Sequence, residues 1–166
     1  YLTDYIDEFV MQVMNNYDGR NFVNASSGEV DLDTKEEKEE LTKKNEEYKD
    51  IFKVMKDTLK DNITDVRFTH RLKNHPVCLV SEGNVSIEME KVMNAMPTDD
   101  KVKANTILEI NENHEISKKL EKLYQSDKQE LEKYTKVLYA QARLIEGLPI
   151  ENPTEISNLV CEILSK

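Results

Sequence analysis

The side chains most able to do chemistry lie between residues 70 and 78. His70, His75 and Cys78 are spaced as H-x4-H-x2-C, and imidazole nitrogen with thiolate sulfur is a ligand set that zinc accepts. A structural zinc site needs four ligands, and no fourth ligand follows at zinc-like spacing. We therefore interpret these residues as two ordinary loop histidines and a buried thiol. A metal-dependent enzyme built on them is the weaker alternative.

Other catalytic patterns are incomplete in the sequence. Asp31-Leu32-Asp33 starts like a calcium-binding loop, but the glycine at its sixth position is missing and Thr42 replaces the bidentate glutamate. The chain has 4 glycines and no glycine-rich loop of the kind that holds phosphates. The paired acids between residues 34 and 50 are typical of a solvated helix face. We predict no catalytic residue, no metal and no cofactor bound to this chain.

Length and charge narrow the class of protein further. The chain has 166 residues, 33 acidic and 23 basic side chains and a net charge of −10, which argues against a nucleic-acid partner. No apolar run reaches the roughly 18 residues of a membrane span. The 2 cysteines, Cys78 and Cys161, form no disulfide framework, which favours a reducing compartment such as the cytoplasm. The start at Tyr1, without a methionine or a signal peptide, leads us to expect a fragment of a longer protein.

Hydrophobic periodicity and the positions of Gly and Pro predict a helix-rich α+β fold with a small sheet. Helices are predicted over residues 2–16, 34–59, 85–96, 113–124, 129–146 and 153–164, and strands over 22–23, 66–72, 77–81 and 106–110. Thr3 is the expected N-cap of the first helix, and Gly147 is expected to end the fifth. The helix over 34–59 is expected to be solvated in its first half and to join the core from Tyr48 onwards.

One apolar stripe lies on the helix predicted over residues 85–96. It consists of Val85, Met89, Val92, Met93 and Met96, whose spacing places them on one helix face. Methionine suits surfaces that adapt to several partners, because its side chain is flexible and polarizable. The same spacing suits a face that packs against the core, and composition does not separate the two.

A second apolar stripe spans the last two helices. Its members are Leu131, Tyr134, Val137, Leu138, Gln141, Ala142 and Ile145 in the first helix, and Ile156, Leu159, Val160, Ile163 and Leu164 in the second. The short Gly-Leu-Pro linker predicts that the two helices form an antiparallel hairpin. Either the sheet of the same chain or a second copy, in a four-helix bundle, would cover the remaining apolar surface.

A series of short segments runs in order through the whole chain. They are DYIDEFVM at residues 4–11, YDGR at 17–20, VRFTHRL at 66–72, HPV at 75–77, LEIN at 108–111 and ENP at 151–153. Together they resemble the C-terminal domain of the heat-shock protein 90 (Hsp90) chaperone family, and its bacterial members in particular. Glu112-Asn113 departs from the resemblance, because the family usually has Pro-Asp there. Phe9 departs too, because it replaces a Trp common in bacterial members.

The resemblance implies a small mixed three-stranded sheet and a homodimer held by a four-helix bundle of the last two helices of each copy. Residues 129–166 are then the dimerisation helix pair, and residues 1–128 form the α/β body of the same domain. The resemblance places in the dimer interface Leu131, Tyr134, Leu138, Gln141, Ala142, Ile145, Ile156, Leu159, Val160, Ile163 and Leu164.

The resemblance also implies a surface that binds non-native client proteins, made of Glu8, Phe9, Gln12, Val85, Met89, Val92 and Met93. In the family, ATP and magnesium bind to regions that precede this domain, so we do not expect this chain to turn over ATP. The chain ends at Lys166, so we expect no acidic tail of the kind that recruits co-chaperones in eukaryotic members. The alternative is a structural module that dimerises without binding clients.

Overall fold

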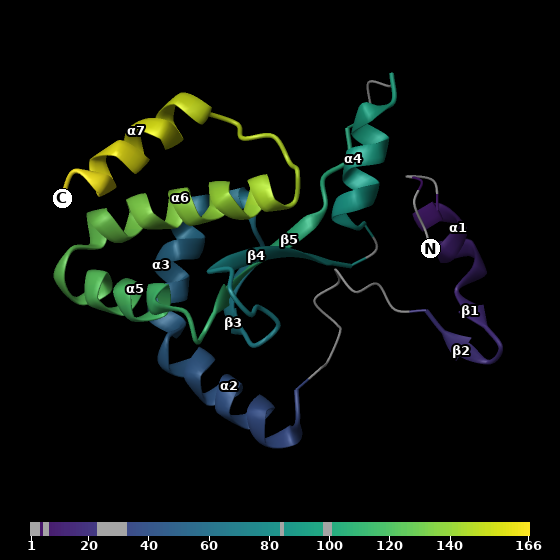
Figure 1. Ribbon diagram of the computed structural model, residues 1–166, viewed down its shortest axis with the longest axis horizontal. Helices are drawn as coiled ribbons and strands as arrows, with labels where there is room; N and C mark the ends of the chain where they lie inside the picture. Colours follow the sequence, from purple (N-terminus) through teal and green to yellow (C-terminus); the bar gives the residue numbers. More distant parts are fainter. Residues whose placement is uncertain (1–3, 5–6, 23–32, 84, 98–100) are drawn as a thin grey trace. The chain divides into compact units, whose positions relative to one another are not determined.

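The computed structural model describes residues 4, 7–22, 33–83, 85–97 and 101–166 (Figure 1). The helices are α1 (Asp7–Met14), α2 (Lys35–Glu47), α3 (Lys49–Leu59), the short 3-10 helix η1 (Lys60–Asn62), α4 (Ile87–Ala95), α5 (Glu115–Ser126), α6 (Lys128–Ile145) and α7 (Pro153–Leu164). The strands are β1 (Asn16–Tyr17), β2 (Arg20–Asn21), β3 (Asp65–Thr69), β4 (Val77–Glu82) and β5 (Asn105–Asn111). The predicted α+β class with a mixed three-stranded sheet is confirmed. Across the described ranges, no helix is both long and apolar enough to cross a membrane.

The chain divides into two compact units. Unit 1 is made of Tyr1–Asp31 and Val80–Thr106, and unit 2 of Leu32–Leu79 and Ile107–Lys166. Each unit therefore combines segments that are distant in sequence. The division into a body over 1–128 and a helix pair over 129–166 concerns function and stays a prediction.

Unit 1 opens with helix α1, which is shorter than the predicted helix over 2–16. The expected N-cap Thr3 lies outside the described residues. After α1, strands β1 and β2 form an antiparallel hairpin. Its turn is Asp18-Gly19, with φ of 50° and 74°, a backbone conformation that glycine adopts without strain. This turn puts the second strand at Arg20–Asn21, so the strand predicted over 22–23 is wrong at Phe22, and Val23 lies outside the described residues.

The three-stranded sheet has the order β3-β5-β4, so the strand that comes last in sequence is central. Strands β3 and β5 run parallel, with Val66 opposite Leu108 and Phe68 opposite Ile110. Strand β5 is buried in all but its first residue, which is expected for a central strand covered on both faces. The strands predicted over 66–72, 77–81 and 106–110 are confirmed with shifts of a few residues at their ends.

The acidic helix predicted as one piece over 34–59 is two helices, so that prediction is wrong in its continuity. The break falls at Tyr48, whose backbone leaves the helical conformation at φ −93° and ψ 4°. The Tyr48 hydroxyl donates to Glu121 Oε2 at 2.7 Å, and its ring meets Phe68 edge-on at 4.8 Å. Burial and the neighbouring Glu121 raise the pKa of Tyr48 to about 12, so the hydroxyl stays a donor at neutral pH. These tertiary contacts turn the chain where the helical pattern alone would continue.

The predicted contrast between the two halves of this segment is confirmed. Along α2, which is described at every residue, no residue is buried. Helix α3 buries Ile51, Phe52, Met55 and Leu59, and it contacts β3 and α6. The Phe52 ring lies edge-on against Phe68 at 5.0 Å, which joins the helix to the sheet.

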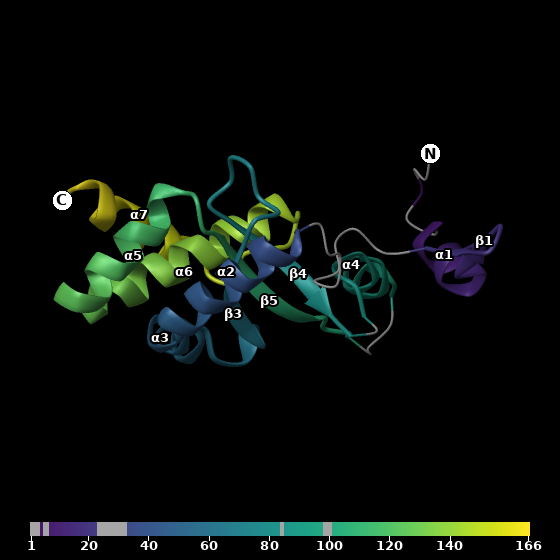
Figure 2. The ribbon, with the colours of Figure 1, turned by 90° about the horizontal axis from the view of Figure 1, so that it is seen from below.

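The last three helices stack on this core, and the views in Figures 1 and 2 agree that α6 runs beside α5. Each begins at a side-chain cap that accepts a backbone hydrogen bond: His114 for α5, Asp127 for α6 and Asn152 for α7. Gly147, at φ 70°, ends α6 as predicted, and α7 then returns alongside α6 (Figure 1). The predicted antiparallel hairpin of the last two helices is confirmed.

Candidate functional site

The first candidate surface lies on helix α4 in unit 1. The Ser86 hydroxyl caps the helix by accepting from the Met89 amide at 3.0 Å, and Ile87 is fully buried beneath the first turn. On the polar side, Glu90 Oε2 accepts from the Ala104 amide at 2.8 Å. The Asn94 side chain donates to the Val102 carbonyl and accepts from the Val102 amide. These bonds fix which face of α4 is turned toward residues 101–104.

The apolar stripe lies beside the face of α4 that is hydrogen-bonded to residues 101–104. Val85, Met89, Val92 and Met93 are half-buried, and Met96 is 47% exposed. The stripe is therefore neither a closed core face nor a fully solvated one. Met89, Val92 and Met93 lie on α4 itself, whereas Val85 precedes its N-cap and Met96 is its C-cap residue. These partly exposed apolar side chains leave room for further contacts.

Helix α1 belongs to the same unit and contacts α4. Phe9 is half-buried, whereas Val10 and Val13 on the same helix are exposed, Val13 at 86%. Glu8 and Gln12 lie in α1, but their side chains are not among the described ones. The structure thus brings Phe9 and the α4 stripe into one unit, while Glu8 and Gln12 are placed only by their helix.

The second candidate surface is the hairpin of α6 and α7 in unit 2. Within α6, Leu131, Leu138 and Ala142 are buried in the chain's own interior, and α6 contacts α3 and α5. Tyr134, Val137 and Gln141 are half-buried, and Ile145 is 45% exposed. The apolar stripe of α6 therefore has two parts: one is buried within the chain, and the other is still partly exposed to solvent.

Helix α7 differs from α6 because none of its residues, all of them described, is buried. Ile156, Leu159, Val160 and Ile163 are half-buried, and Leu164 is 80% exposed. Sequence analysis missed one neighbour of this surface, Leu144, which is 62% exposed at the end of α6. The seven-residue spacing from Val137 to Leu144 was the signal that would have found it.

Two ion pairs hold α7 against α6. Lys136 Nζ lies 2.8 Å from Glu155 Oε1, and Lys133 Nζ lies 2.5 Å from Glu162 Oε2. The hydrogen bond from Lys136 lowers the pKa of Glu155, and that from Lys133 lowers the pKa of Glu162. Exposed pairs of this kind orient a helix more than they stabilise it. Leu164, beyond these pairs on α7, stays 80% exposed.

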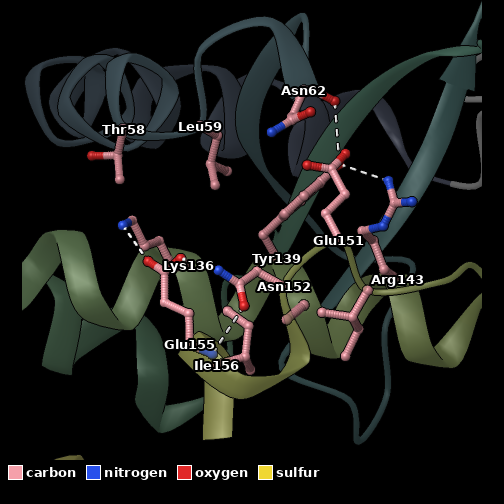
Figure 3. A pocket seen from close by; sticks show the side chains of 12 residues that line it. Thr58, Leu59, Asn62, Lys136, Tyr139, Arg143, Glu151, Asn152, Glu155 and Ile156 are labelled. Atoms are coloured by element: carbon pink, nitrogen blue, oxygen red, sulfur yellow. Dashed lines mark hydrogen bonds and ion pairs between the residues drawn. The ribbon is translucent and has the colours of Figure 1, made fainter. Parts of the chain in front are cut away.

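A small pocket lies where α3, α6 and the start of α7 meet (Figure 3). At its wall, Arg143 Nη1 donates to the Tyr139 hydroxyl at 3.0 Å, and that hydroxyl donates to the Asn62 carbonyl. The cavity measures about 150 Å³, below the roughly 300 Å³ at which small-molecule sites begin. The pocket therefore is a structural junction, in which the buried Arg143 is satisfied by neighbours.

The residues first considered for metal binding have separate partners. Cys78 Sγ lies 3.8 Å from Glu109 Oε2, and burial, with the nearby Glu109 charge, raises the pKa of this thiol to about 12. A thiol with so high a pKa is a poor nucleophile at neutral pH. His70 Nε2 lies 2.6 Å from Glu112 Oε2. In the described part of the chain, no three His, Cys, Asp or Glu side chains are placed to hold a metal ion.

An α+β domain with half-covered apolar faces on several helices is the kind of structure that binds other proteins. The sequence model of the family described as "Hsp90 protein" matches residues 1–166, and the chain belongs to that family. It is 45% identical over 164 residues to the chaperone protein HtpG of Bacillus subtilis (strain 168). It is 47% identical to the chaperone protein HtpG of Clostridium botulinum (strain Langeland) and 46% to that of Clostridium perfringens (strain 13).

Each of these alignments covers 99% of this chain but only 26% of the relative. The chain therefore spans about a quarter of the length of the relatives that it matches. The family resemblance carried by the short segments is confirmed. The dimer contacts and the client contacts stay predictions.

Proposed function

We propose that this chain is the dimerisation region of an ATP-dependent molecular chaperone. In this proposal α6 and α7 pair with the same helices of a second copy to form a four-helix bundle. The observation that carries it is that α7, described at every residue, buries no side chain, while Leu144 and Ile145 at the end of α6 are exposed as well. Two helices from each copy bury enough surface for a stable dimer, on the order of 2,000 Å².

We further propose that α4, together with Phe9 of α1, contacts non-native proteins. A patch of several partly exposed methionine and valine side chains tolerates many apolar partners. Its contacts are weak one by one, because ordering costs offset most of the gain from apolar burial. Weak, tolerant binding is what a chaperone needs in order to release its clients.

The remaining parts of the activity lie with the rest of the protein in this proposal. ATP and magnesium act in regions outside this chain. The residues here hold two copies together and offer the α4 surface of each copy to a client protein in the cytoplasm. Joining two copies raises the effective concentration of the second client-binding surface.

Sedimentation equilibrium over a wide concentration range tests the dimer. The unmodified chain should fit a monomer–dimer equilibrium, and Leu144→Glu with Leu164→Glu should weaken the dimer at least tenfold. Leu138, one of the residues expected at the interface, is a poor target, because it is buried within its own chain and its replacement by a charge would disturb folding. Val13→Glu, at an apolar site on α1 that is also exposed, is the control and should leave the dimer intact. A monomer at every concentration contradicts the proposal.

Suppression of the aggregation of a thermally unfolded model protein tests the client surface. Met89→Asp with Met93→Asp should abolish suppression while the mass of the dimer stays the same. The control, Met89→Leu with Met93→Leu, keeps the apolar surface and should keep the suppression. If the aspartate variant suppresses aggregation as well as the unmodified chain, the chain is instead a dimerising structural module.

A further inference from the structure

None of the residues that line a groove in unit 2 belongs to either candidate surface. It has a volume of about 500 Å³ and runs between α2, α3 and the first residues of β3. Thr42, Asn45, Glu46, Lys49, Phe52, Lys53, Lys56, Asp65, Val66 and Arg67 line it. Figures 1 and 2 show α2, α3 and β3 side by side, in agreement with their contacts.

The groove borders the free edge of the sheet. Strand β3 is an outer strand, because β5 is its neighbour in the order β3-β5-β4. The Phe68 amide points away from β5 and donates to Asn45 Oδ1 at 2.7 Å. Backbone groups of alternate residues in a parallel strand face the same side, so the amide and carbonyl of Val66 face this edge too. Asn45 closes the edge at Phe68, whereas Val66 lies in the groove.

Four basic side chains and the acidic Glu46 and Asp65 line the groove, so it is net basic, although the chain as a whole carries a net charge of −10. Lys49 pairs with Glu46 at 2.8 Å, and Arg67 is held by Glu109 at 2.7 Å. Lys53 and Lys56 are exposed, and neither has an ion-pair partner within the described ranges. Two unpaired ammonium groups therefore stand on α3 beside a strand edge.

We propose that this groove binds an extended acidic segment of a partner protein, which adds a strand to β3 at Val66. Strand addition gives main-chain hydrogen bonds, and alternate side chains of the added strand then share one face. In an extended segment, residues i and i+2 are about 6.6 Å apart. Lys53 and Lys56, three apart on a helix, have Cβ atoms about 5–6 Å apart, so two carboxylates at alternate positions match them.

The partner is therefore recognised by an alternation of acidic and apolar residues, not by a fold. Its side chains meet lysines on one side, and Phe52 with Val66 forms the apolar floor between them. The open edge is short, and the lysines are exposed, so the binding is weak and falls as salt concentration rises. This inference does not depend on the proposed dimer or on the client surface.

A blocked peptide of alternating glutamate and valine, bound to the 166-residue chain in a fluorescence anisotropy titration at low salt, is the probe. Lys53→Glu with Lys56→Glu should weaken binding at least tenfold. Lys118→Glu with Lys122→Glu makes the same charge change on exposed positions of α5 and should leave the affinity within twofold. Bound peptide should also slow hydrogen exchange at the Val66 amide.

Two results overturn the proposal. One is a peptide affinity that the Lys53 and Lys56 reversals leave unchanged. The other is equal binding of a single-stranded DNA oligonucleotide, with the same dependence on Lys53 and Lys56 and no protection of the Val66 amide. That outcome would make the groove a general polyanion patch with no role for the strand edge.

Discussion

Helices α2 and α3 follow one another in sequence, yet they are held to the same core by different forces. Helix α3 is fixed by burial: Met55 is fully inaccessible, and Phe52 packs on Phe68. Helix α2 buries no residue and is fixed at its ends and by polar side chains, through Thr34, Lys44 and Asn45. A stretch of chain without buried side chains is thus positioned by a few directional hydrogen bonds and ion pairs.

Because α3 is held by burial, we expect a substitution in its buried face to destabilise the whole fold. Met55→Ala should lower the free energy of unfolding by about 2–5 kcal/mol, because a fully buried side chain is lost and a cavity remains. Urea denaturation followed by circular dichroism measures the change. Met55→Leu, which nearly keeps the volume, should cost less than about 1.5 kcal/mol. Equal losses for both variants would mean that burial at this position is not what holds α3.

A substitution that removes a polar contact of α2 should destabilise the fold less, and its effect should be confined to the neighbourhood of α2. Asn45→Ala removes the acceptor of the Phe68 amide, whose residue is 1% exposed, and leaves a buried donor unsatisfied. The expected loss is about 1–3 kcal/mol in the free energy of unfolding. Asn45→Asp keeps an oxygen acceptor and should recover most of that loss. If Asn45→Ala leaves the free energy of unfolding unchanged, water replaces the side chain as the acceptor of the Phe68 amide.

The same contrast explains what could be predicted from the sequence. Periodicity located α6 and α7, the end of α6 at Gly147 and the buried second half of the 34–59 segment, because burial and capping are local patterns of residue type. It joined α2 to α3, because the break at Tyr48 depends on Glu121 and Phe68, which are distant in sequence. The order of the sheet was hidden for the same reason, since β5 inserts between two strands that precede it.

The candidate surfaces show the limit of such patterns. The stripes on α6 and α7 look alike in sequence, but Leu131 and Leu138 are covered by their own chain and Leu164 is not. An apolar stripe predicts that a face will be covered and does not say by what. Glu112 illustrates the converse: in sequence it was only a departure from the family pattern, yet it accepts a hydrogen bond from Lys44 of α2 and lies 2.6 Å from His70 Nε2.

Glu112 provides the pH-dependent part of the attachment of α2. Its Oε1 lies 2.5 Å from Lys44 Nζ and its Oε2 lies 2.6 Å from His70 Nε2. Burial alone would raise the pKa of Glu112, but the bonds to Lys44 and His70 outweigh it and hold the pKa below the ordinary 4.5. A carboxyl group with a lowered folded-state pKa stabilises the fold above its unfolded-state value. That contribution is lost as the pH falls through the folded-state pKa.

Glu112→Gln should therefore cost about 1–2 kcal/mol in the free energy of unfolding near pH 7. The difference from the unmodified chain should start to shrink below about pH 5 and should vanish at still lower pH. Denaturation at a series of pH values measures it. His70→Gln separates the two partners, because the pH dependence that persists in it belongs to the pair with Lys44. A difference that stays constant from pH 7 to pH 3 would contradict the assigned role.

The smallest effect is expected at the free end of α2. Thr34 Oγ1 accepts from the Glu37 amide at 3.3 Å, and Glu37 Oε2 accepts from the Thr34 amide at 2.7 Å, which together form a capping box. Thr34→Ala should cost about 0.5–1 kcal/mol, since the cap is exposed and only the first turn depends on it. Amide hydrogen exchange should speed up in the first turn of α2 and stay unchanged in α3, and Thr34→Ser should behave like the unmodified chain. Faster exchange in α3 as well would mean that the two helices unfold as one unit despite the break at Tyr48.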